Sequence, residues 1–237
     1  MADRIIPAAE LAAKNKAHFP NEGPEYRQAR NALLAEEIEL RRHIARVAAL
    51  RRALPAGGKV PEDYVFEGRE GAVRLSQLFG DKDTLVLYSM MFGPQRERGC
   101  PMCTAMLTSW DGAARNLRER VAVAVTARSP IERLLDFKKE RGWQNLHIYS
   151  DTEGNYTRAY VDAGDGDVPG LSVFTRCDGI VRHLWSGEMS GEMADPGQDP
   201  RGAPDLDPLW TILDLTPAGR GVTWYPKLEY PSLTTIK

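Results

Sequence analysis

Two almost continuous apolar runs constrain the fold of this chain most strongly. The first covers residues 84–92 and the second covers residues 121–126. Such runs are typical of parallel strands that are buried on both faces of a sheet. A helix is expected between them, from about Cys100 to Arg120, and it would join the two strands through a right-handed crossover. The sequence therefore predicts a domain of alternating strands and helices.

Local patterns predict the other elements of this domain. Asp178-Gly179 separates two runs of strand-forming residues, 171–175 and 180–185, and Asp-Gly is a strong signal for an antiparallel hairpin. Residues 151–170 are polar and rich in Gly and Asp, so we expect a loop there. The remaining expected elements are a hairpin over residues 64–73, a helical turn over 75–80, a helix from Ser129 to before Gly142, a strand over 147–150 and a last helix that begins at Asp207-Pro208.

The N-terminal part of the chain has a different pattern. Residues 1–24 contain three prolines among scattered polar residues, and we expect an irregular arm. A single amphipathic helix is predicted from Glu25 to Leu54, because proline suits its first position and Pro-Ala-Gly-Gly follows its end. The predicted organisation is an arm and long helix over residues 1–57, an α/β domain over 58–221 and a C-terminal tail over 222–237.

Two of these segments are candidate interfaces. The long helix is expected to pack on its own chain, and the alternative is that it serves as a dimerisation arm. The tail carries Trp224, Tyr225 and Tyr230, and we expect these rings to lie across a surface of this chain or of a partner. A homodimer through the helix or the tail is therefore one expected partnership.

Composition excludes several classes of protein. The formal net charge of −2 lacks the basic excess of a nucleic-acid binder. No apolar run reaches the ~18 residues of a membrane span, and the first residues do not resemble a secretory signal. Three cysteines in 237 residues are too few for a disulfide scaffold. We therefore expect a cytoplasmic protein that binds neither nucleic acid nor membrane.

The most informative motif is Cys100-Pro101-Met102-Cys103, which follows a predicted buried strand and opens a predicted helix. The free N–H groups and the dipole at a helix N-terminus stabilise a thiolate there. Arg96 and Arg98 lie just upstream and are expected to lower the pKa of Cys100 further. Cys103 lies one turn further along the helix, within reach for a disulfide. We expect Cys100 to be the attacking thiol and Cys103 the resolving thiol.

Two alternatives for the cysteine pair remain open. A zinc site would need about four ligands, but Cys177 and the four histidines form no second cluster at metal spacing, so no metal is predicted. The pair could also be inert and buried. Cys177 is expected to be a bystander. No phosphate-binding or dinucleotide-binding motif follows a strand, so no cofactor is predicted.

The chain resembles the bacterial family DUF899, which is thioredoxin-like and related to the peroxiredoxin (AhpC/TSA) group. The resemblance covers about residues 25–221 and implies a thioredoxin-like α/β fold, a central mixed sheet flanked by helices, with an N-terminal helical extension. It implies no established substrate. The stretches that carry it are residues 30–37, 63–68, 91–94, 99–103, 110–112, 170–174 and 213–220.

The resemblance also implies roles for residues around the cysteines. Pro169 occupies the place of the proline that packs against the Cys-x-x-Cys segment in thioredoxin-like folds, so it is expected to shape a substrate groove with Pro101 and Met102. Thioredoxins carry a buried acid on the strand before the cysteines. Here that position falls near Tyr88, which we expect to take over the acid's role.

Two further features bear on the site. Trp110 is expected to pack in the core before a local helix break at Gly112, and the alternative is that it forms a wall of the thiol pocket. Peroxiredoxins need a threonine three residues before the reactive cysteine, and Glu97 stands there, so a standard peroxidase site is not expected.

The function predicted from these observations is thiol–disulfide exchange through Cys100 and Cys103. Its partners would be a protein or small-molecule disulfide or thiol, and an electron donor that the sequence does not identify. One alternative is a thiol-dependent, peroxidase-like reductase of a small electrophile. The other is a non-enzymatic module that uses the same fold for binding or dimerisation.

Overall fold

The computed structural model describes residues 5–164, 166–188, 193–199, 201 and 206–230. Its contacts divide the chain into two compact units, Met1–Pro55 and Ala56–Lys237. Each unit has its own hydrophobic cluster or clusters, and each is described separately below.

The N-terminal unit consists of helix α1 (Ala8–Ala13) and the long helix α2 (Pro24–Arg52), which are joined by a short irregular segment. Ala8 and Ala12 of α1 pack against Ile38 of α2. The prediction of a helix beginning after Pro24 is confirmed, with proline at its first position. The prediction that residues 1–24 are irregular is wrong for α1, because four alanines with Glu10 and Leu11 form a strong local helix former.

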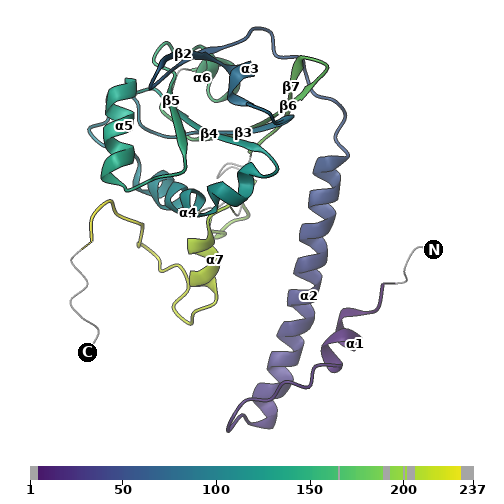
Figure 1. Cartoon of the computed structure of the whole chain (residues 1–237). Coiled ribbons are helices and arrows are strands. Elements are labelled where there is room, and N and C mark those ends of the chain that lie inside the picture. The colour runs from purple at the N-terminus through teal and green to yellow at the C-terminus, as the bar shows by residue number, and fades with distance from the viewer. Residues whose placement is uncertain (1–4, 165, 189–192, 200, 202–205, 231–237) are drawn as a thin grey trace. The chain divides into compact units, whose positions relative to one another are not determined.

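In the described part of the second unit, seven strands form one mixed sheet, in the order β2-β1-β5-β4-β3-β6-β7 (Figure 1). The central strands β3, β4 and β5 are parallel, while β6 runs antiparallel to β3 and the β1–β2 and β6–β7 pairs are antiparallel. The bounds are Val65–Gly68 for β1, Gly71–Arg74 for β2, Thr84–Ser89 for β3, Ala122–Ala127 for β4, His147–Ser150 for β5, Gly170–Cys177 for β6 and Ile180–Ser186 for β7.

Helices cover both faces of this sheet. Residues alternate along β3, so Val86 and Tyr88 belong to the cluster beneath α4 and α5, while Leu85 and Leu87 belong to the cluster with α3 and α6. The helices of this unit are α3 (Leu75–Leu78), α4 (Pro101–Arg118), α5 (Ile131–Glu140), α6 (Asn155–Tyr160) and α7 (Pro208–Asp214).

The unit β3-α4-β4-α5-β5, followed by the β6–β7 hairpin and α7, is a thioredoxin-like arrangement. The predicted fold, a mixed sheet flanked by helices with an N-terminal helical extension, is confirmed. The predicted Asp-Gly hairpin is also confirmed, because Asp178 and Gly179 both adopt positive φ, 51° and 75°, as a type I′ turn requires. Asp207 caps α7 as expected by accepting a hydrogen bond from the Leu209 N–H at 3.0 Å.

Three local predictions are wrong. The strand predicted over residues 84–92 ends at Ser89, and the following residues turn into a loop. Helix α4 continues through Gly112 without a break. The loop predicted over residues 151–170 contains α6, which the Asp151 carboxylate holds at its start by accepting hydrogen bonds from the N–H and hydroxyl of Thr157.

The C-terminal tail lies on its own unit as far as Tyr230. Trp224 packs edge-on against Trp210 of α7 with ring centroids 6.0 Å apart, and Arg141 donates to the carbonyl of Leu228. The Trp224 ring therefore packs on a surface of its own chain. None of the helices in the described part of the chain has the length and apolarity needed to cross a membrane.

Candidate active site

The loop between β3 and α4 positions Cys100 at the start of α4. The Cys100 N–H donates to the Met91 carbonyl at 3.0 Å, which ties the cysteine back to the end of β3. Cys100 is the N-cap residue, and Pro101 occupies the first helical turn, where its missing N–H costs nothing. The predicted helix start at the cysteine pair is therefore confirmed.

Gly99 allows this close turn. A Cβ atom at residue 99 would lie 2.9 Å from Cζ of Phe137 and closer still to Cε of Met90, within the core beneath the loop. A larger residue would therefore push Cys100 away from the sheet. This is a packing requirement rather than a requirement for an unusual backbone angle.

The two thiols are free and differ in exposure. Cys100 is half-buried, whereas only 4% of Cys103 is exposed. The pKa of Cys100 is lowered to about 6, chiefly by a hydrogen bond from the Cys103 thiol, which outweighs the opposite effect of burial. The backbone N–H groups of Cys103 and Met102 and the charge of Arg96 add to this lowering. Cys100 is therefore poised as a thiolate at neutral pH.

Cys103 has the opposite tendency. Its hydrogen bond to Cys100 and its burial raise the pKa of Cys103 well above the ordinary value of a thiol. The Tyr88 hydroxyl donates a hydrogen bond to Sγ of Cys103 at 3.2 Å. Burial raises the pKa of Tyr88 well above its ordinary value, so this hydroxyl keeps its proton. The structure thus brings Tyr88, which the sequence placed at the position of the missing acid, into direct contact with Cys103.

A buried carboxylate from a distant part of the sequence lies near this group. Asp207, the N-cap of α7, is only 6% exposed, and its charge contributes to raising the pKa of Tyr88. Burial raises the pKa of Asp207 itself above the ordinary value. From the sequence, Asp207 was predicted only to start a helix. Nothing in a pattern of local residues could indicate that it approaches Tyr88, more than one hundred positions earlier.

Two arginines organise the loop that precedes Cys100. Arg133 of α5 donates to the carbonyls of Arg96 and Glu97, and its guanidinium lies 4.6 Å from the centre of the Phe92 ring. Arg96 in turn pairs with Asp167. The sequence predicted no role for Arg133 and placed Asp167 only in the loop expected over residues 151–170. Arg133 instead fixes the backbone before Cys100, and Asp167 fixes the Arg96 cation beside it.

Pro169 lies at the same end of the sheet as the cysteine pair. It immediately precedes β6, whose first residue, Gly170, pairs with Ser89 at the end of β3. Pro169 is exposed, and the Asp167–Arg96 ion pair connects its segment to the loop before Cys100. Pro101 and Met102 are partly exposed beside Cys100. These positions are compatible with the predicted groove, whose use by a substrate remains a proposal.

The other predicted residues have different surroundings. Arg98 pairs with Glu140 and Glu229, so its charge is already engaged, and Arg96 is the cation that acts on Cys100. Trp110 packs against Tyr88 with ring centroids 5.9 Å apart, and its N–H donates to the Leu206 carbonyl at 3.3 Å. Trp110 thus supports the Tyr88 side of the thiol pair.

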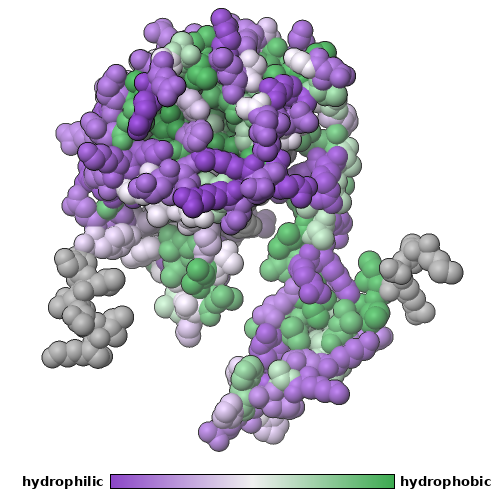
Figure 2. Space-filling view, viewed as in Figure 1, coloured by the Kyte–Doolittle hydropathy of each residue, from purple (hydrophilic) through white to green (hydrophobic). Residues whose placement is uncertain are grey.

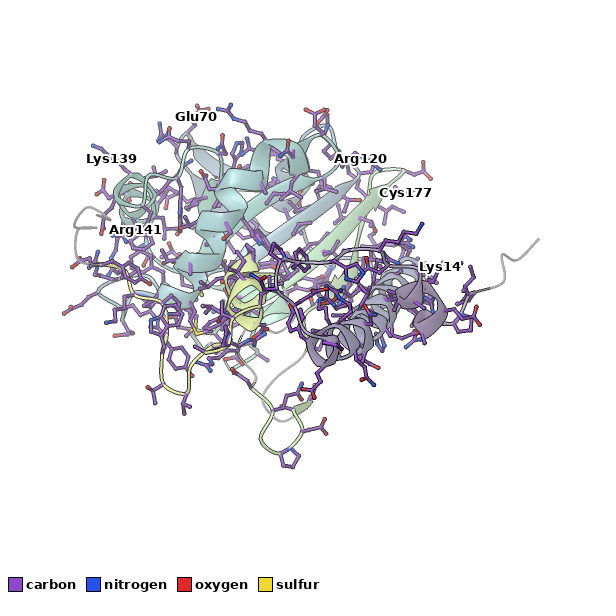
Figure 3. All side chains as sticks on the ribbon, turned by 90° about the horizontal axis from the view of Figure 1, so that it is seen from below. Lys14, Glu70, Arg120, Lys139, Arg141 and Cys177 are labelled. Atoms are coloured by element: carbon purple, nitrogen blue, oxygen red, sulfur yellow. The ribbon has the colours of Figure 1, made fainter. Side chains whose placement is uncertain are left out.

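Cys177 is separated from the pair. It ends β6 at the turn of the hairpin, opposite to the end where Gly170 pairs with Ser89 (Figure 3). Eight residues of strand span roughly 25 Å, so Cys177 is too far away to exchange disulfides with Cys100 without unfolding. Among the described residues, no group of three or more His, Cys, Asp or Glu side chains is arranged to hold a metal ion.

Comparison with known protein families gives one match. The model of a family described as "Bacterial protein of unknown function (DUF899)" matches residues 16–231. A search of curated proteins finds no match.

Solved structures of low sequence identity also resemble part of the chain. Reduced Prx3 from Vibrio vulnificus in complex with hydrogen peroxide is 14% identical, with a TM-score of 0.43 over 60% of this chain and 92% of that one. Peroxidoxin BcpB from Mycobacterium tuberculosis is 20% identical, with a TM-score of 0.41 over 67% and 98%. A putative thiol:disulfide interchange protein DsbE from Chlorobium tepidum is 19% identical, with a TM-score of 0.38 over 56% and 84%.

Proposed function

This chain belongs to the DUF899 family of bacterial proteins, and we propose that it is a thiol–disulfide oxidoreductase that acts through Cys100 and Cys103. One observation carries the proposal: a half-buried thiol at a helix N-terminus, with its pKa lowered to about 6, lies one turn from a buried thiol whose pKa is raised. This difference is what a two-step exchange needs, since one sulfur must attack first and the other must wait.

The exchange proceeds in two displacements. The Cys100 thiolate attacks one sulfur of a substrate disulfide, so that a Cys100–substrate bond forms and the other substrate sulfur leaves as a thiolate. Cys103 then loses its proton and attacks Cys100, which forms the Cys100–Cys103 disulfide and releases the second substrate thiolate. Two electrons pass from the cysteine pair to the substrate, and a dithiol substrate would run the same steps in reverse.

Tyr88 and Asp207 take part in the second displacement. Cys103 must give up its proton although burial and its neighbours raise its pKa. The Tyr88 hydroxyl lies 3.2 Å from the Cys103 sulfur, and the buried Asp207 carboxylate acts electrostatically on Tyr88. We assign to Asp207 the role of the buried base that accepts the Cys103 proton, and to Tyr88 the role of a hydrogen-bond donor that stabilises the Cys103 thiolate as it forms.

The proposed activity suits the cytoplasm, where cellular thiols are kept reduced and the pair would be regenerated as a dithiol by an electron donor. The substrate would bind at the end of the sheet where Pro101, Met102 and Pro169 meet solvent. Its class is a protein or small molecule that carries a disulfide.

Replacing Cys100 tests the proposal directly. The Cys100→Ser variant should lose reduction of a model disulfide such as oxidised glutathione or an aromatic disulfide, because no thiolate remains to attack. The Cys103→Ser variant should instead accumulate a stable mixed disulfide at Cys100, detectable by mass spectrometry. Cys177→Ser is the matched control and should behave as the wild type. Retained exchange in Cys100→Ser would exclude the proposed function.

Peroxide consumption distinguishes the alternative enzyme class. A peroxidase-like reductase would consume hydrogen peroxide through Cys100 at a rate far above that of a free thiol, with little reduction of disulfides. The proposed oxidoreductase should show the reverse preference. Failure of both assays, with both thiols titrating as ordinary thiols, would leave the non-enzymatic binding module.

A further inference from the structure

Helix α2 has an apolar stripe that α1 does not cover. Its members recur every seven residues, and we call them the α2 stripe: Tyr26, Leu33, Leu40 and Val47. Leu54, seven residues further on, lies beyond the end of the helix at Arg52. The exposed fractions of Leu33 and Leu40 are 53% and 61%, which is unusual for side chains of this size on a helix. Figure 2 shows hydrophobic residues gathered on the visible side of this unit. A seven-residue apolar repeat supplies one of the two seam positions of a left-handed coiled coil. The residues three positions further along are Ala29, Glu36, His43 and Leu50, so this seam would be partly polar.

The α2 stripe and the α1 contact lie on different sides of the helix. Leu34, Ala35 and Ile38 face α1. At 3.6 residues per turn, Ile38 lies roughly 160° around the helix from Leu40. Contact with α1 therefore explains only one of the two apolar faces of α2.

The surface of the stripe has the shape that a coiled-coil partner requires. A shallow groove on α2 is lined by Leu33, Glu36, Glu37 and Leu40, with Glu39 and His43 continuing it. The first four residues stand at spacings of three, four and seven, which is the diamond that receives one side chain of a facing helix. Leucines stand at both ends of this diamond, whereas a helix face that stays in water usually carries polar residues there.

Charge around Leu40 identifies the partner helix and its direction. Residues 34–39 contain three glutamates and no base, whereas residues 41–46 contain three arginines, one histidine and no acid. Two copies of α2 in parallel register would oppose acids with acids and bases with bases. Two antiparallel copies with Leu40 at the centre would oppose the acidic segment of each with the basic segment of the other.

Ion pairs within α2 do not conflict with this arrangement. Glu37 pairs with Arg30 at 2.9 Å, and Glu39 pairs with Arg42 at 2.9 Å. Both pairs are partly exposed, and exposed pairs contribute about 0–1 kcal/mol, so they can re-form across an interface at little cost.

We propose that the α2 stripe pairs with the same stripe of a second copy of this chain, antiparallel, with a two-fold axis at Leu40. The boundary between the acidic and basic segments falls at this residue. Leu40 then packs against its own counterpart, and Leu33 packs against Val47. The interface is isologous, as a closed dimer requires. It does not depend on the thiol chemistry.

The test is the oligomeric state of the full chain at micromolar concentration, measured by sedimentation equilibrium. The wild type should be a dimer, and Leu40→Glu should be a monomer with its dimer dissociation constant raised about 100-fold or more, because two carboxylates would meet in an apolar seam. Ala49→Glu is the matched control, since it adds the same charge at an exposed position away from the stripe. Unchanged helical circular dichroism in all three proteins excludes unfolding as the cause.

Cross-linking then tests the direction of pairing, in a Cys177→Ser background. A mixture of Leu33→Cys and Val47→Cys chains should form a disulfide-linked dimer, while Leu33→Cys alone should form little more than the background chain. A monomeric wild type, which is expected if another part of the chain covers the stripe, would overturn the proposal. So would a dimer that survives Leu40→Glu, or efficient cross-linking of Leu33→Cys alone.

Discussion

At the scale of single residues, Cys100 and Cys103 differ most in what surrounds each sulfur atom. Cys100 receives a thiol hydrogen bond and two backbone N–H groups, whereas Cys103 is enclosed by the core, where the Tyr88 hydroxyl and the Met91 backbone only partly offset burial. Hydrogen bonds to the charged form lower the pKa of an acid, and burial raises it. The same short motif therefore holds one thiol ionised and the other protonated.

The first prediction at this scale concerns the hydrogen bond from Cys103. In a Cys177→Ser background, the rate of Cys100 alkylation by iodoacetamide should rise with pH around a midpoint of about 6. Cys103→Ala removes the largest cause of the lowered pKa, so the midpoint should move up toward the ordinary value of a thiol. Thr108→Ala, farther along α4, is the control and should not move it. An unchanged midpoint in Cys103→Ala would contradict the account of Cys100.

The second prediction concerns Asp207. Asparagine caps a helix about as well as aspartate, so Asp207→Asn keeps the cap of α7 and removes only the titrating carboxylate. With an aromatic disulfide, the first release of thiolate should be unchanged. The second release, which reports Cys103 attacking Cys100, should slow on the order of 100-fold and lose its rise above the raised pKa of Asp207.

The same experiment separates two failures. If Asp207→Asn releases the second thiolate as fast as the wild type, Asp207 is only a helix cap, while the two-cysteine mechanism stands. If the wild type shows no second release, the two-cysteine mechanism itself fails. The unfolding midpoint of Asp207→Asn should stay close to that of the wild type.

At the scale of elements, α4 is fixed to the sheet by a carboxylate. Asp111 accepts hydrogen bonds from three consecutive backbone N–H groups, those of Gln144, Asn145 and Leu146, at 2.7 to 3.1 Å. Burial raises the pKa of Asp111, but these bonds outweigh it and leave the pKa below its ordinary value. Asp111 thus joins the helix of the cysteine pair to the loop that leads into β5.

The third prediction concerns this contact. Asp111→Ala leaves three backbone N–H groups, that of Leu146 buried, without their acceptor and should lower the free energy of unfolding by about 3 kcal/mol, measured by urea denaturation. Asp136→Ala, on the exposed side of α5, is the matched control and should change it little.

The pH dependence of stability follows from the same contact. Because the folded pKa of Asp111 is lowered, its contribution is fully present above the unfolded pKa of about 3.9 and is lost as pH falls through the folded value. The free energy of unfolding of Asp111→Ala should therefore fall less steeply in acid than that of the wild type. Equal stabilities at neutral pH would contradict the assigned role.

The elements show which features the sequence could predict. The strands β3 and β4, the start of α4 at Pro101 and the Asp178-Gly179 turn have local signals: apolar runs, a proline and a dipeptide. Helix α6 has no comparable local signal: it is only six residues long, and a glycine precedes it instead of a capping side chain. Besides Asp151 at its start, it is held by distant partners: Tyr156 is fully buried against Phe66 and Phe174. Arg133 and Asp207 were likewise missed because their contacts join segments far apart in the sequence.

At the scale of the whole molecule, the thiol pair belongs to one of two units. Every contact described around Cys100 and Cys103 comes from the second unit, from β3, α4, α5, α7 and the segments before α4, β6 and α7. The thioredoxin-like unit therefore contains all the proposed chemistry, and the helical unit offers a surface for assembly. These two properties can be changed by separate substitutions.

The most direct test of the central claim is a redox titration of the full chain in glutathione buffers, with free thiols counted by mass after alkylation. The account predicts a reversible Cys100–Cys103 disulfide, with Cys177 still reduced, and a potential between about −120 and −270 mV, the range of known exchange proteins. The absence of such a disulfide, or a potential below about −300 mV as in structural disulfides, would contradict it.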